Sequence, residues 1–134
     1  MTNCLFCKII NGLLPAHKIW QDEHFLAILD INPNTPGHTL LLPQIHEPYV
    51  FDLEEPLYTN LFTVAKQLSK PLLEVTKAKR IGVVIQGFTV PHVHVHLIPM
   101  NEIYDLDDAR AAPALDAELA AMAFEMKQAI SSQP

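Results

Sequence analysis

Three histidines occur at every second position in the segment PHVHVHLIP, residues 91–99. On a β-strand, successive side chains point to opposite faces and the rise is about 3.3 Å per residue, so His92, His94 and His96 would line one face. Imidazole can bind a metal, attack an electrophile or hydrogen-bond to a charged substrate. Each buried ring needs partners for both nitrogens. A row of three rings therefore indicates a functional site rather than three separate structural histidines.

Two chemistries fit the three rings. All three could hold one metal ion, although imidazoles spaced along one strand do not easily converge on an ion at about 2.1 Å. Alternatively, one ring is the nucleophile of a group-transfer reaction and its neighbours stabilise the charge that develops. Geometry leaves both open. No lysine or arginine occurs from Ile81 to Met100, so negative charge would have to be met by a histidine, backbone N–H groups or a hydroxyl group.

Cys4 and Cys7 are the only cysteines of the chain and have a C-x-x-C spacing. They are too close for an ordinary stabilising disulfide and too few for a secreted disulfide framework. They could form a redox pair, although such pairs normally follow a strand at the start of a helix. They could also pack as small apolar side chains, or provide half of a tetrahedral zinc site.

Hydrophobic periodicity predicts the elements that would position these residues. Apolar runs predict five strands, over residues 17–21, 25–30, 39–42, 81–85 and 92–98. Apolar spacings of three and four residues predict three helices, over residues 4–11, 56–75 and 115–130. Pro71 should bend the second helix or end it early, and residues 86–89 should form a tight hairpin connection. This order predicts one α+β domain, residues 1–134, around an antiparallel sheet.

Length and charge argue against several classes of function. The 134 residues suffice for one domain that buries roughly two-thirds of its surface. With 9 basic and 15 acidic residues the formal charge is -6, which is unsuited to binding a nucleic-acid polymer through its phosphates. No stretch approaches the roughly 20 apolar residues of a bilayer span, and the residues from Met1 to Cys4 lack an export-signal pattern. We therefore expect a cytoplasmic protein with no membrane partner.

The segment PHVHVHLIP resembles the signature of the histidine-triad family, in which hydrophobic residues separate and follow three histidines. The resemblance extends over residues 4 to 100, through CLFCKIINGLLPAHKIWQDE, FLAILDINPNTPGHTLLLP and His46. It implies an α+β domain with a five-stranded antiparallel sheet that usually pairs into a homodimer. Residues 101–134, an acidic loop and the last helix, lie outside the match.

The resemblance also implies a reaction. The middle histidine, His94, would attack the α-phosphorus of a nucleoside phosphoramidate or related phosphoanhydride and carry the nucleotidyl group until water removes it. The backbone carbonyl of His92 would orient the His94 ring, and His96 would hold the phosphate. The expected ligand is a purine nucleotide or nucleotide conjugate, with no organic cofactor. The alternative is a nucleotide-binding regulator with little turnover.

Several further residues are expected to bind the nucleotide. By family position, Asp30 would hold the ribose hydroxyls, and Thr89 stands where relatives carry a phosphate-binding serine. Each could instead be a turn residue, and the isoleucines proposed to flank the base could be core residues. The expected nucleotide-binding residues are, in chain order, Ile28, Asp30, Ile31, His38, Gln86 and Thr89. The connection that holds Gln86 and Thr89 is shorter than the glycine-rich loop of many relatives.

Some triad proteins, and the related galactose-1-phosphate uridylyltransferases, bind zinc through a C-x-x-C pair and two histidines. The resemblance maps that zinc site onto Cys4, Cys7, His46 and His92. Such a structural zinc would attach the N-terminal turn to the catalytic strand and leave His94 free. If His92 does not bind zinc, His38 is expected to form a hydrogen bond with it.

Overall fold

The computed structural model describes residues 3–133, which form one five-stranded antiparallel sheet flanked by helices. The strands lie in the order β1-β2-β3-β5-β4, and every neighbouring pair is antiparallel. Their bounds are β1 Lys18–Gln21, β2 Phe25–Leu29, β3 Thr39–Pro43, β4 Arg80–Val84 and β5 Val95–Met100. The predicted α+β class and the five-stranded sheet are confirmed.

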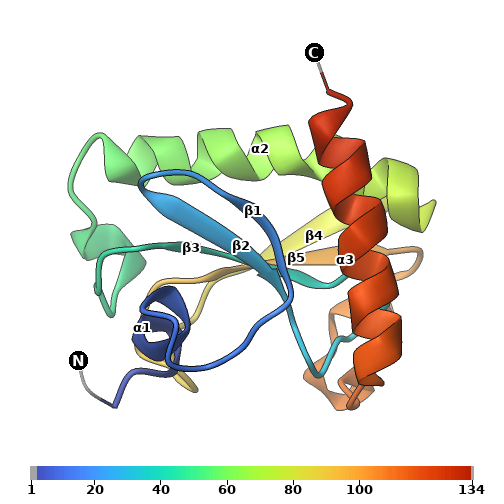
Figure 1. The fold of residues 1–134 in the computed structure, drawn as a ribbon, viewed down its shortest axis with the longest axis horizontal. Helices are drawn as coiled ribbons and strands as arrows, with labels where there is room; N and C mark the ends of the chain where they lie inside the picture. The colour runs from blue at the N-terminus through green and yellow to red at the C-terminus, as the bar shows by residue number, and fades with distance from the viewer. Residues whose placement is uncertain (1–2, 134) are drawn as a thin grey trace.

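Three α-helices cover the sheet, namely α1 (Leu5–Ile10), α2 (Leu57–Thr76) and α3 (Asp116–Ser131). Helices α2 and α3 pack on one side of the sheet, and α1 lies on the other (Figure 1). Pro71 lies inside α2, and the helix continues for another turn beyond it. The expectation that this proline ends the helix early is therefore wrong. None of the helices in the described part of the chain is long and apolar enough to cross a membrane.

Side-chain alternation gives the sheet two apolar faces. Ala27, Leu29 and Leu41 point toward α2 and α3 and belong to the larger core. Their neighbours Ile28 and Leu40 point to the opposite face, where they pack near α1 in a smaller cluster. Each fully buried leucine or isoleucine stabilises the fold by about 1.5–3 kcal/mol. The sheet therefore has no wholly solvated face, and any pocket on the α1 side is walled by fixed apolar side chains.

The histidine segment is only partly a strand. Strand β5 begins at Val95, so only His96 lies within it, and residues 85–94 form an irregular connection from β4. The predicted start of the strand at residue 92 and the tight connection over residues 86–89 are therefore wrong. The reason is hydrogen bonding, because the N–H of Val93 donates to the carbonyl of Glu47 at 2.7 Å rather than to a residue of β4.

Despite this, the alternation predicted for the segment persists. Val93, Val95 and Leu97 are buried in the core beneath α2. The rings of His94 and His96 lie on the other side, with centroids 4.9 Å apart. The segment is therefore extended enough to direct its histidines to the α1 face, although part of it makes no ladder hydrogen bonds.

Candidate functional site

A pocket of about 500 Å³ lies on the α1 side of the sheet and brings the predicted nucleotide-binding residues together. Its wall includes two of the three predicted catalytic histidines, His94 and His96. It also includes all six predicted nucleotide-binding residues, Ile28, Asp30, Ile31, His38, Gln86 and Thr89. Ile28 is buried in the smaller apolar cluster as well, whereas Ile31 is 60% exposed. His92 lies behind this wall and does not line it.

His94 is held in the tautomer that a nucleophile needs. Its Nδ1 lies 2.7 Å from the backbone carbonyl of His92, and because a carbonyl can only accept, this nitrogen carries the hydrogen. Nε2 then keeps its lone pair. Burial lowers the pKa of His94, and the hydrogen bond to His92 and the charge of Asp30 oppose this only in part. The ring is therefore neutral near pH 7, which is the nucleophilic form.

His96 is held in the opposite tautomer. The N–H of Asn34 donates to Nδ1 of His38 at 3.0 Å, so the hydrogen of His38 is on Nε2. That Nε2 lies 3.0 Å from Nδ1 of His96 and donates to it. The hydrogen of His96 is consequently on Nε2, so this atom is a donor. The expected alternative pairing of His38 with His92 does not form, because the His38 ring bonds to His96.

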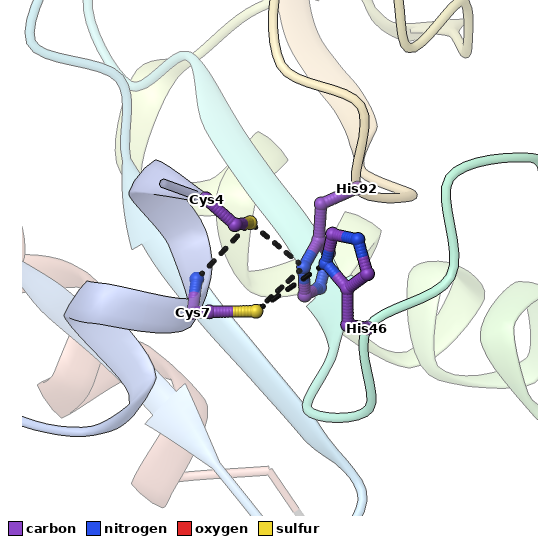
Figure 2. A group of neighbouring side chains, drawn as sticks. All are labelled: Cys4, Cys7, His46 and His92. Atoms are coloured by element: carbon purple, nitrogen blue, oxygen red, sulfur yellow. Dashed lines mark hydrogen bonds between the residues drawn. The ribbon is translucent and has the colours of Figure 1, made fainter. Parts of the chain in front are cut away.

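His92 points toward the two cysteines (Figure 2) and does not line the pocket. Its Nε2 donates to the carbonyl of Pro43 at 2.8 Å, so Nδ1 carries the lone pair. That Nδ1 lies 3.4 Å from Sγ of Cys4 and 3.6 Å from Sγ of Cys7. Nδ1 of His46 lies 3.4 Å from Sγ of Cys7. Thus the three histidines of the segment, although alike in type, have three different sets of partners.

The four residues of this second cluster fit a tetrahedral zinc ion. Their ligand atoms all lie within 4.8 Å of one another, and Cys4, Cys7 and His92 are buried. With Zn–S at 2.3 Å and Zn–N at 2.1 Å, tetrahedral angles place sulfur and nitrogen about 3.6 Å apart, which is close to the separations found here. The hydrogen bond from His92 to Pro43 is the kind of support that ligating histidines usually receive.

Asp30 directly follows β2 and lines the pocket next to the His38 ring. Its Oδ1 accepts from the N–H of Asn32 at 2.9 Å, and its Oδ2 lies 3.6 Å from Nε2 of His38. Burial raises the pKa of Asp30, and the hydrogen bond from Asn32 lowers it. Oδ1 of Asp30 therefore has the turn role considered from the sequence, while Asp30 also lines the pocket.

Gln86 and Thr89 form the exposed rim of the pocket. The side-chain oxygen of Gln86 accepts from the N–H of Phe88 at 2.5 Å, which closes the local turn. Thr89 follows directly, in the irregular connection between β4 and β5. The connection between β4 and β5 therefore supplies two polar side chains to the pocket that His94 lines.

Phe6, Asn34 and Asp108 are among the pocket residues that were not predicted from the sequence. The ring of Phe6 lies 4.8 Å from that of His94 in an edge-to-face arrangement, Asn34 lies beside His38, and Asp108 lines the same pocket. In the sequence, Phe6 lies between the two cysteines and far from the triad, so no local pattern indicated that its ring contacts His94. Asn34 contacts His38 through its backbone N–H, which any residue except proline could provide. Asp108 could be recognised only once the loop after β5 was seen to fold back on the pocket.

The His38–His96 pair predicts a loss of stability in acid. Burial and repulsion by neighbouring histidines lower the pKa of His38 to about 3, and burial is the main cause that lowers that of His96 to about 4. A histidine in the unfolded chain titrates near pH 6.5. Between that pH and about 4, the unfolded chain therefore binds more protons than the folded chain, and the free energy of unfolding decreases as the pH is lowered.

This dependence can be measured by urea unfolding of wild type and His38→Asn from pH 7.5 to pH 4.5. The variant should lose part of the acid sensitivity, whereas His24→Asn, at an exposed histidine, controls for the loss of one titratable ring. Equal slopes in the His38→Asn variant and wild type would show that the pair does not titrate as described.

Comparison with known proteins identifies the family. The HIT domain model matches residues 11–103. The chain is 37% identical over 106 residues to an uncharacterized HIT-like protein of Borreliella burgdorferi, covering 74% of this chain and 76% of that protein. It is 34% identical over 100 residues to the adenosine 5'-monophosphoramidase HNT1 of Saccharomyces cerevisiae, covering 74% of this chain and 63% of that protein.

A solved structure extends the likeness beyond the range of the family match. The crystal structure of a Zn-bound histidine triad family protein from Mycobacterium smegmatis has a TM-score of 0.83 to this structure at 27% sequence identity. The alignment covers 97% of this chain and 94% of that chain. The family model matches most of the chain, and the chain has the triad segment and the five-stranded sheet. The chain therefore belongs to the histidine triad (HIT) family.

Proposed function

We propose that the protein hydrolyses a nucleoside phosphoramidate or a related nucleotide conjugate at its α-phosphorus, through a nucleotidyl intermediate on His94. The observation that carries this proposal is the fixed tautomer of His94, whose Nε2 lone pair is left available by the hydrogen bond from Nδ1 to the His92 carbonyl. The similarity to an adenosine 5'-monophosphoramidase supports the choice of substrate class.

The reaction has two displacements. Nε2 of His94 attacks the α-phosphorus, an N–P bond forms, and the bond to the leaving amine breaks as the amine gains a proton from solvent. Water then attacks the same phosphorus, an O–P bond forms as the N–P bond breaks, and the proton lost by the water passes to solvent, which releases the nucleoside monophosphate and restores neutral His94. Both steps place negative charge on the phosphoryl oxygens, and the Nε2–H of His96 is the donor positioned to meet it.

The remaining pocket residues would bind the nucleoside. Ile28 and Ile31 provide an apolar wall for the base, and Asp30 accepts hydrogen bonds from the ribose hydroxyls. Thr89 and the amide nitrogen of Gln86 are donors at the rim for the phosphate or leaving group. This assignment uses each polar group in a role that its chemistry permits.

Asp30 gives a test of the ribose assignment. The Asp30→Asn variant should raise KM for an adenosine phosphoramidate about 10-fold, since hydrogen bonds to a charged acceptor contribute about 1.5–3 kcal/mol. It should also reduce the preference for the substrate over its 2'-deoxy analogue. Steady-state kinetics with both substrates check this, and Asp52→Asn, at an exposed carboxylate outside the pocket lining, is the matched control. An unchanged preference would remove Asp30 from the ribose site.

We also propose that Cys4, Cys7, His46 and His92 bind a structural zinc ion. The donor set, its separations and its burial support this, and so does the Zn-bound relative of similar fold. A bound zinc would fix α1, which carries Phe6, against the segment that carries His94. The chain's own residues, rather than the metal, would carry out the reaction.

A binding protein with little turnover is the second candidate, motivated by the resemblance in sequence, by which the connection before His92 is shorter than the glycine-rich loop of many relatives. Calorimetry with AMP and a turnover assay with adenosine 5'-phosphoramidate separate the two candidates. The proposed enzyme binds AMP and releases it from the substrate at many turnovers per site. Saturable AMP binding without product would favour the regulator.

A further inference from the structure

A carboxylate from the loop after β5 completes the pocket wall. Asp108 lines the pocket with Asp30, although the two residues are far apart in sequence. The HIT domain match ends at residue 103, so Asp108 lies beyond it. Asp108 is exposed and is the first residue of a short 3-10 helix, η3 (Asp108–Arg110). Its charge is therefore open to solvent and to an incoming ligand.

The loop that carries Asp108 is held in shape by its own polar contacts. The guanidinium of Arg110 donates to Glu102 at 2.6 Å and to Asp105 at 2.9 Å. The other oxygen of Asp105 accepts from the backbone N–H groups of Asn101 at 2.8 Å and Glu102 at 3.1 Å. Asp105 is only 6% exposed. The buried carboxylate thus joins both ends of the loop, which limits the positions available to Asp108.

The same loop is attached to the segment that follows β2. The side-chain amide of Asn34 donates to the carbonyl of Asp105 at 3.1 Å. The N–H of Ala114 donates to the carbonyl of Ile31 at 3.1 Å. Because Asp30 precedes this segment directly, the contacts hold the loop that carries Asp108 beside the pocket that Asp30 and His96 line.

The pocket has no positive charge to balance the two carboxylates. Its lining, within residues 3–133, includes no lysine or arginine. His38 and His96 are neutral near pH 7, because their pKa values are lowered to about 3 and about 4. The negative charge of Asp108 acts on both Asp30 and His96, since it acts to raise the pKa of each of them. A phosphate that enters the pocket therefore meets a negative field.

We propose that Asp108 is a specificity-determining residue that selects against ligands with phosphates beyond the α-phosphate. The pocket then favours nucleoside monophosphate conjugates whose leaving group is neutral or cationic, such as an amine. Dinucleoside polyphosphates and nucleoside diphosphates carry extra negative charge and bind less well. This inference rests on the proposed function only in placing a nucleotide in the pocket, and it does not require that the nucleotide be hydrolysed.

The test uses the full-length protein and calorimetric titration with adenosine, AMP and ADP at low ionic strength. Two variants each remove one negative charge, Asp108→Asn in the pocket and Glu125→Gln on the exposed face of α3. Asp108→Asn should leave the Kd for adenosine within about twofold and tighten ADP relative to AMP by about threefold to tenfold. Glu125→Gln should leave all three as in wild type. The effect of Asp108→Asn should shrink in 0.5 M salt, because the Debye length is then only about 4 Å.

Two results would overturn the inference. Equal ADP to AMP affinity ratios in Asp108→Asn and Glu125→Gln would show that Asp108 does not read ligand charge, whatever the catalytic activity. Absence of AMP binding in every variant would remove the nucleotide from the pocket, and with it this proposal. If AMP binds and the ratio shifts while no phosphoramidate is hydrolysed, the inference holds and only the proposed reaction fails.

Discussion

Replacing His94 by alanine should reduce hydrolysis of adenosine 5'-phosphoramidate by about 10⁴-fold or more, because removal of a covalent nucleophile leaves only binding and electrostatic stabilisation. AMP should still bind, since Asp30, Ile28 and Ile31 remain in place. The result is measured by single-turnover and steady-state assays of AMP release. Circular dichroism and urea unfolding show whether the variant keeps the fold, as expected for a pocket-lining ring.

A matched control separates the loss of a nucleophile from the loss of any histidine. His24→Ala removes a half-exposed ring from the turn between β1 and β2 and should leave the rate within about twofold of wild type. Rates near wild type in the His94→Ala variant would contradict the mechanism outright. A loss of AMP binding in that variant, with the rate constant for bound substrate unchanged, would reassign His94 to ligand binding.

Replacing Cys4 by serine should remove zinc from the purified protein and lower its melting temperature by about 10 °C or more. Metal binding contributes directly to folding free energy, and one lost thiolate leaves an incomplete tetrahedral site. Elemental analysis of wild type should give about one zinc per chain, and the variant should hold less than about a tenth of that. Melting is followed with and without a chelator.

His96→Asn is the control for the location of the metal. Asp30, His38 and His96 form a second group of possible ligands in the described part of the chain, within 4.8 Å of one another. If zinc binds at the cysteine cluster, His96→Asn retains it and the Cys4→Ser variant loses it. The opposite result would place the metal at Asp30, His38 and His96 and favour a metalloenzyme mechanism.

Much of the fold follows from local pattern. The strands and helices were predicted to within a few residues, because the apolar periodicity of α2 and the apolar runs of β2 and β3 agree with their burial. The start of β5 was not, because a backbone hydrogen bond from Val93 to Glu47 replaces ladder pairing. That bond links residues far apart in sequence, and no local pattern specifies it.

The residues of the site and the contact between the His92 carbonyl and the His94 ring were predicted from the sequence, but the partners that fix the tautomers of His92 and His96 were not. All the expected nucleotide-binding residues line one pocket, and the four expected zinc ligands form one cluster. The tautomers of His92, His94 and His96 depend on the carbonyl of Pro43, the carbonyl of His92 and the ring of His38. Two of these three partners are distant in sequence, so they are set by the folded chain.

The stereochemical course at phosphorus tests covalent catalysis by His94 most directly. A phosphoramidate made chiral at the α-phosphorus with oxygen isotopes is hydrolysed by wild-type protein in isotopically labelled water, and the configuration of the released AMP is determined. Two in-line displacements, first by Nε2 of His94 and then by water, predict retention of configuration. Inversion would mean that water attacks the substrate directly, and it would contradict the nucleotidyl-histidine intermediate.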